Sequence, residues 1–147
     1  MNSKEIIKKL TLIWIALISG QIMFAGVLLF LRKNGQIFGS EELDKILLMS
    51  VPMIVVVLIA SSILIFKQQI AKIKTEENLE NKLNKYQSAT IISFALLESP
   101  SLLSLISFFL TENNLFLYLS ILVIFLFFIS KPSEHKLNMD LEISEKE

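Results

Sequence analysis

The stretch Leu10–Leu31 reads LTLIWIALISGQIMFAGVLLFL and contains no charged residue. At a rise of ~1.5 Å per residue, a helix of this length spans the ~30 Å hydrocarbon core of a bilayer. Lys4, Lys8 and Lys9 precede the stretch, as basic residues do in a signal peptide. The apolar run is too long for the core of a signal peptide, however, and no small-x-small cleavage site follows it. We therefore predict a retained membrane-spanning helix.

Three further apolar blocks follow, at residues 46–66, 89–110 and 115–130. The first two are also long enough to cross a membrane, whereas the last reaches only ~24 Å and needs its polar neighbours at the interfaces. A mean hydropathy of +0.62, with 53% hydrophobic and 19% charged residues, is unsuited to a water-soluble globule. We predict an all-α, polytopic membrane protein, in which residues 1–131 form an antiparallel bundle of four transmembrane helices.

The basic residues are divided unevenly between the two sides of such a bundle. With the amino terminus inside, all of the 14 Lys and Arg residues except Arg32, Lys33 and Lys45 lie on the cytoplasmic side. The positive-inside rule then predicts that both termini are cytoplasmic. The composition is rich in Lys, Ile and Asn, as is typical of proteins from AT-rich bacterial genomes, so the expected location is a bacterial inner (cytoplasmic) membrane.

Two segments outside the apolar blocks have their own character. Residues 67–88 are rich in Lys and Glu, and their apolar residues recur at spacings of three, four or six: Ile70, Ile73, Leu79, Leu83 and Tyr86. This pattern predicts a cytoplasmic helical hairpin, which is either a solvated surface or a docking site for a soluble partner. Residues 132–147 are mostly polar and are predicted to be a mobile tail.

Glu98 is the only acidic residue within the four apolar blocks. It lies near the centre of the 89–110 block, and Gln21 lies near the centre of the 10–31 block. The two helices are expected to run in the same direction, so Glu98 and Gln21 should have similar depths and could form a hydrogen bond if the helices are adjacent. An ionised carboxylate at this depth costs ~2.5–3.5 kcal/mol, which favours the neutral carboxyl unless a partner is present.

Hydroxyl residues follow one side of the same predicted helix, within a sector of about 120° that Glu98 flanks. Pro100 has no N–H, and it therefore leaves the carbonyl of Leu96 without its helical donor. A titratable acid beside hydroxyls and a free carbonyl suits a proton or cation relay. The candidate relay groups are Glu98, Gln21, Ser101, Ser93 and Leu96. The alternative is structural, in which a protonated Glu98 fixes the helix register and the serines allow close packing.

Several kinds of chemistry have no basis in this sequence. Cysteine is absent and His135 is the only histidine, which excludes disulfides, thiolate chemistry and any metal site with two histidines. No glycine-rich phosphate loop or nucleophile triad occurs, and a single intramembrane acid has no acid/base partner. We expect no enzyme activity, no cofactor and no nucleic-acid binding. The expected partners are the lipid bilayer and either further copies of the chain or the subunits of a larger membrane complex.

Two resemblances add to these expectations. The segment ISFALLESPSLLSLISFFL, residues 92–110, resembles the carboxylate-bearing helix of the rotor-ring (proteolipid) subunits of rotary ATPases. That resemblance implies that Glu98 carries an ion, although the glycine-repeat helix of the family is missing. Over most of its length the chain is similar to small uncharacterised four-helix membrane proteins of Bacteroidota-type bacteria. This similarity rests on three short segments, Ala95–Ser99, Thr111–Asn113 and Lys131–Ser133, and implies no particular activity.

These observations lead to two functional predictions. The first is a small bacterial inner-membrane protein in which Glu98 takes part in proton or cation translocation or relay. The alternative is a non-catalytic structural or assembly subunit of a larger membrane complex.

Overall fold

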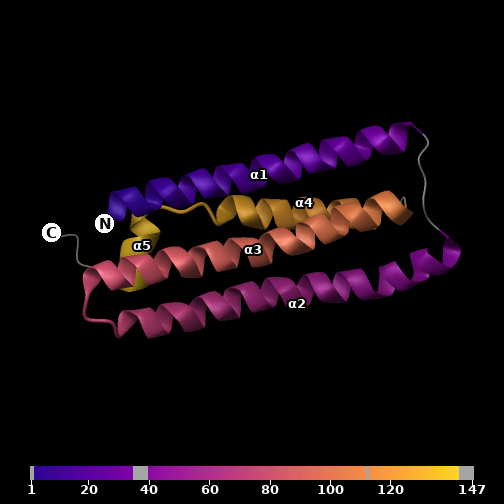
Figure 1. Ribbon diagram of the computed structural model, residues 1–147. Coiled ribbons are helices and arrows are strands. Elements are labelled where there is room, and N and C mark those ends of the chain that lie inside the picture. Colours follow the sequence, from indigo (N-terminus) through magenta and orange to yellow (C-terminus); the bar gives the residue numbers. More distant parts are fainter. Residues whose placement is uncertain (1, 35–39, 112, 143–147) are drawn as a thin grey trace.

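The computed structural model describes residues 2–34, 40–111 and 113–142. Over these residues the chain is helical, with no strands, which confirms the all-α class. The helices are α1 (Ser3–Lys33), α2 (Glu41–Lys74), α3 (Leu79–Thr111), α4 (Asn114–Ile129) and α5 (Glu134–Leu141). The four longer helices lie side by side, with α1 and α3 running in one direction and α2 and α4 in the other (Figure 1). We call the end where α1 begins and α5 lies the terminal end, and the opposite end the distal end.

The lengths of the helices support a membrane protein. Three of them, α1, α2 and α3, are each long and apolar enough to span a bilayer, and they contain 31, 34 and 33 residues. The fourth predicted span is shorter in the structure, because α4 contains only 16 residues. It reaches spanning length only together with α5, from which it is separated by a bend of 78°. Within the described residues, three or four helices can therefore cross a membrane.

Helix α3 occupies the centre of the bundle. It packs against α1, α2 and α4, and it buries a larger share of its residues than α1 or α2 does. The outward faces of α1 and α2 expose large apolar side chains, among them Met23 (72%), Phe30 (65%), Met49 (79%) and Met53 (69%). Exposed apolar surface on this scale is costly in water but suits contact with lipid. Among the described residues, five of the eight buried polar side chains belong to α3: Thr90, Ser101, Ser104, Ser107 and Thr111.

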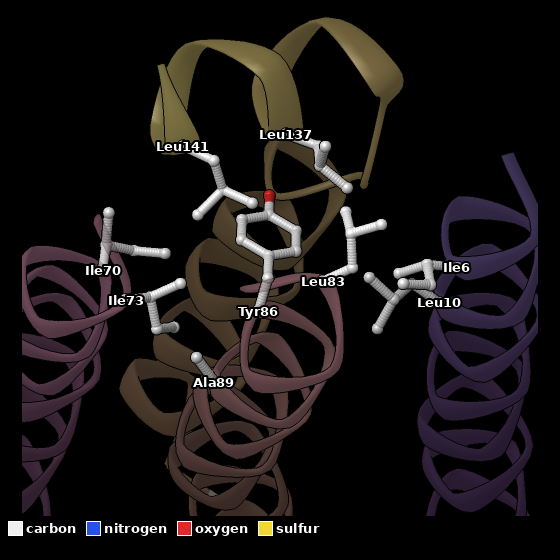
Figure 2. Close-up of a cluster of buried hydrophobic side chains, with 9 residues drawn as sticks. All are labelled: Ile6, Leu10, Ile70, Ile73, Leu83, Tyr86, Ala89, Leu137 and Leu141. Carbon is white, nitrogen blue, oxygen red and sulfur yellow. The ribbon is translucent and has the colours of Figure 1, made fainter. Parts of the chain in front are cut away.

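At the terminal end, α2 and α3 continue past their apolar blocks and are joined by a short turn, residues 75–78. These extensions are helical over the region predicted to be a hairpin, residues 67–88, and Lys85 pairs with Glu76 beside the turn. The hydrogen bond from Lys85 holds the pKa of the Glu76 carboxyl below its usual range. Buried side chains from three long helices and α5 meet here (Figure 2): Ile6, Leu10, Ile70, Ile73, Leu83, Tyr86, Ala89, Leu137 and Leu141.

The prediction of a mobile polar tail over residues 132–147 is wrong for residues 134–141. These form α5, and its Leu137 and Leu141 side chains are 0% and 1% exposed (Figure 2). The helix begins because the Ser133 hydroxyl accepts a hydrogen bond from the backbone N–H of Lys136 at 3.2 Å. It stays in place because residues four apart share one helix face, so both leucines reach the same apolar cluster. Residue 131 is thus not a domain boundary, and residues 143–147 lie outside the described part.

Polar contacts also hold α5 against the bundle. The Tyr86 hydroxyl donates to Oδ2 of Asp140 at 3.2 Å, and Lys74 Nζ pairs with Glu142 Oε1 at 2.6 Å. Lys136 Nζ donates to the carbonyl of Ile129 at 2.8 Å and therefore satisfies a group at the end of α4. These contacts join α5 to α2, α3 and α4, so the terminal end of the bundle is a folded layer.

Candidate functional site

Three aromatic residues set the register of α1, α3 and α4 in the terminal half of the bundle. The indole N–H of Trp14 in α1 donates to the backbone carbonyl of Phe127 in α4 at 3.0 Å. The rings of Phe94 in α3 and Phe127 lie 5.3 Å apart, centroid to centroid. Trp14, Phe94 and Phe127 are all buried in one cluster. The relative heights of the three helices are therefore fixed at this point.

A layer of buried polar residues lies two helical turns from this cluster, toward the distal end. Gln21 follows Trp14 by seven residues, Ser101 follows Phe94 by seven, and Ser120 precedes Phe127 by seven in the antiparallel α4. Seven residues correspond to about 10 Å of helix and return a side chain to nearly the same face. The exposed fractions of Gln21, Ser101 and Ser120 are 1%, 0% and 0%. We call these three residues the polar layer.

The polar layer is poorly satisfied by hydrogen bonds. The hydroxyl oxygens of Ser101 and Ser120 are 3.5 Å apart, at the outer limit for such a bond. Neither Oε1 nor Nε2 of Gln21 has a hydrogen-bond partner within the described structure. A side-chain amide offers two donors and an acceptor, and leaving a buried polar group unpaired costs about 1–3 kcal/mol. The amide of Gln21 therefore has unused capacity for a water molecule, a cation or a carboxyl group.

Glu98 lies within one helical turn of the polar layer, three residues before Ser101 on α3. Its side chain is partly buried on the flank of the helix. The adjacency of α1 and α3, on which the predicted pairing of Glu98 with Gln21 depended, is confirmed. The predicted hydrogen bond itself is not formed, because the amide of Gln21 has no partner. The structure thus places the two groups on neighbouring helices at similar depths, without joining them.

The other two predicted relay groups lie apart from the layer. Ser93 is two turns closer to the terminal end, where its hydroxyl lies 3.0 Å from that of Ser62 and its carbonyl accepts from Ser62 at 3.1 Å. It thus connects α3 with α2, on a different side from Gln21. Pro100 lies inside α3, as predicted, and cannot donate to the carbonyl of Leu96. Leu96 itself is partly buried.

The remaining hydroxyls of α3 do not form a connected chain. Each donates to a carbonyl four residues earlier in its own helix, as in Thr90 to Tyr86, Ser104 to Pro100, Ser107 to Leu103 and Thr111 to Ser107, all at 2.8 Å. These side chains are satisfied locally and allow close helix packing. The local bonds of these two threonines and two serines fit the structural alternative, whereas Ser101 differs because its hydroxyl faces that of Ser120.

Ser120 and Ser62 are not predicted from the sequence, and the structure brings them against α3 from α4 and α2. Ser120 is the only serine within the 16 residues of α4, and this isolation was the available signal. The described residues contain no group of three or more His, Cys, Asp or Glu side chains that could hold a metal ion. Any cation at the polar layer would thus depend on neutral oxygens and on Glu98.

The fold and the polar layer define a class: a small, all-helical membrane protein with unpaired polar groups inside its helix bundle. The chain matches no protein-family model, no curated protein and no solved structure. The two resemblances drawn from the sequence therefore stay predictions.

Proposed function

We propose that this protein takes part in proton or cation movement across a bacterial inner membrane, with Glu98 as the group that exchanges the ion. In this proposal α4 is the fourth span and both termini are cytoplasmic, as the distribution of Lys and Arg favours. The observation that carries the proposal is the buried amide of Gln21, whose two polar atoms are both unpaired. A purely structural residue at this position would be expected to have partners or to be apolar.

The chemistry follows from polar groups that lie at similar depths on α1, α3 and α4. The amide of Gln21 and the hydroxyls of Ser101 and Ser120 can hold a water molecule or a desolvated cation by neutral oxygens. Glu98 is the only ionisable side chain between residues 89 and 110, so it supplies the charge that moves. Its position on the flank of α3 suits exchange between two copies of the chain, since four helices enclose little volume.

Labelling with a hydrophobic carbodiimide tests this role of Glu98. The reagent attacks a protonated carboxyl in an apolar setting, so labelling of Glu98 should decrease as the pH is raised. Glu98→Gln should abolish the labelling and should lower proton or cation flux into proteoliposomes at least tenfold. Glu77→Gln is the matched control, because Glu77 is exposed in the turn between α2 and α3. Unchanged flux in Glu98→Gln contradicts the proposal.

A second candidate function is a non-catalytic subunit of a larger membrane complex, and one observation favours it. The terminal end is a folded layer made by α5 and the extensions of α2 and α3. Between those two extensions lies a groove of about 420 Å³, lined by Gln69, Lys72, Ile73, Asn84, Lys85 and Ser88. A preformed groove with exposed lysines suits an acidic segment of a partner subunit.

Charge reversal separates this candidate from the first. If a defined set of subunits co-purifies with the chain in mild detergent, Lys72→Glu should remove that set by reversing a charge in the groove. Lys4→Glu, on the exposed part of α1, should retain the same set. Retention of all subunits in Lys72→Glu argues against docking at this groove. Glu98→Gln should have no effect on co-purification if the chain acts only as a subunit.

A further inference from the structure

A groove opens between α2 and α4 in the terminal half of the bundle, with α3 as its floor. In the distal half, α2 and α4 close over α3, where Val51, Val55, Phe116 and Val123 belong to one buried cluster. Nearer the terminal end there is instead a cavity of about 340 Å³, a volume in the range of ligand pockets. It is lined by residues 62–67 of α2, by α3 and by the segment from the end of α4 to α5.

Away from the terminal end, the wall of this groove is formed by apolar side chains together with the hydroxyls of Ser62 and Ser93, which bond to each other. Ile63 and Phe66 line it from α2, and Phe94 and Leu97 line it from α3. These four residues belong to the apolar blocks that cross the membrane, and Ile63 is 50% exposed. The groove therefore has an apolar wall that is open to the lipid-facing side of the bundle.

The rim of the groove at the terminal end is charged. Lys67 directly follows Phe66, the last residue of the apolar block at residues 46–66. Lys136 and Asp140 reach the rim from α5. Lys67 has no ion pair or hydrogen bond within the described part of the chain. Lys136 donates to two backbone carbonyls, at 2.8 and 3.2 Å, which hold its ammonium in place and leave a third N–H. Oδ2 of Asp140 accepts from Tyr86, whereas Oδ1 has no partner within the described structure.

We propose that this groove binds a phospholipid whose headgroup carries both a phosphate and a primary amine, as in a phosphatidylethanolamine. The phosphate lies between Lys67 and Lys136, the amine meets Asp140, and an acyl chain follows the apolar part of the groove past Phe94 to Leu97. Two cations and one anion at the rim complement this headgroup, and basic pockets between transmembrane helices bind the phosphate-bearing headgroups of lipids. The α5 helix is essential to the site, because it supplies Lys136 and Asp140.

Lipid binding to the purified full-length chain in mild detergent tests the proposal. After delipidation, native mass spectrometry with equal amounts of phosphatidylethanolamine and phosphatidylglycerol should show tighter binding of phosphatidylethanolamine. Lys67→Gln keeps most of the side-chain length and removes one charged donor, so it should weaken that binding about tenfold. Lys72→Gln, five residues further along α2 and outside this groove, should leave the affinity within about twofold.

A second variant tests the contact with the amine. Asp140→Asn keeps an acceptor for Tyr86 but removes the negative charge, so it should abolish the preference for phosphatidylethanolamine over phosphatidylglycerol. Equal affinities of the wild-type chain for the two lipids, or equal effects of Lys67→Gln and Lys72→Gln, would overturn the proposal. Glu98→Gln should bind lipid normally, because Glu98 does not line the groove. The lipid-binding variants and the Glu98→Gln flux experiment therefore test the two proposals separately.

Discussion

Replacement of Gln21 by methionine is expected to raise the free energy of unfolding of the protein by about 1–3 kcal/mol. The amide of Gln21 is 1% exposed and makes no hydrogen bond in the described structure, so it is desolvated without compensation. Methionine has a similar unbranched shape and no amide to desolvate, and it tolerates irregular packing. The measurement is unfolding in mixed micelles with increasing amounts of a denaturing detergent. Trp14 is the only tryptophan of the chain and lies two turns from Gln21, so its fluorescence reports the transition.

Gln68→Met is the matched control for this experiment, because Gln68 is exposed on α2. Its effect should stay within about 0.5 kcal/mol, as for most surface substitutions. A loss of stability in Gln21→Met has the opposite meaning: the amide is then satisfied in the membrane by a bound water, an ion or the carboxyl of Glu98. If the Gln21→Met variant is more stable than the wild type but has lost ion flux, the result supports the relay. In that case the wild-type chain keeps Gln21 at a cost in stability because the amide is needed for function.

Truncation of Leu137 to alanine is expected to release α5 from the bundle. The Leu137 side chain is 0% exposed and inserts among Leu83, Tyr86 and residues of α1 and α2, and a Leu→Ala change at such a site costs about 2–5 kcal/mol. An isolated helix of eight residues is not stable in water, so α5 depends on this docking. Hydrogen exchange of the backbone amides at residues 138–141 should therefore accelerate at least about 30-fold.

Met139→Ala provides the control for α5. Met139 lies on the opposite face of the same helix and is 64% exposed, so its truncation should change amide exchange by less than about twofold. Unchanged protection of residues 138–141 in Leu137→Ala would show that polar contacts alone, such as those of Asp140 and Glu142, hold α5. In that case Lys74→Ala, which removes the partner of Glu142, becomes the variant that should release it.

Much of the architecture follows from hydrophobicity and spacing within single segments. The apolar runs at residues 10–31, 46–66 and 89–110 correspond to α1, α2 and α3, since the length and polarity of a run decide whether it can cross a bilayer. The hairpin over residues 67–88 followed in the same way from apolar residues at helical spacing. Glu98 and Gln21 were placed at similar depths by counting residues, and the adjacency of their helices agrees with this placement.

The polar layer could be predicted only in part. Gln21 and Ser101 were identified from the sequence, but Ser120 joins them only because the bond from Trp14 to Phe127 sets the height of α4 against α1. The groove between α2 and α4 likewise depends on how α4 and α5 lie over α3, which no single segment specifies. Ser93 was expected to belong with Ser101, because both lie on the same side of the helix in the sequence pattern. In the structure it contacts Ser62 of α2 instead.

The sequence by itself determined that the chain is all-helical and where three helices long and apolar enough to span a membrane lie. It also determined which residue is the only acid within the apolar blocks. These properties depend on local composition, because the bilayer acts on each segment separately. Only the tertiary structure decided which polar groups meet, that Gln21 has no partner, and that residues 134–141 fold. A side-chain contact between helices depends on their relative height and rotation, and these are set by packing among residues distant in the chain. The α5 helix is the clearest case. Two leucines in a polar segment do not predict that the segment is buried, and only the apolar cluster around Leu83 and Tyr86 explains why they are.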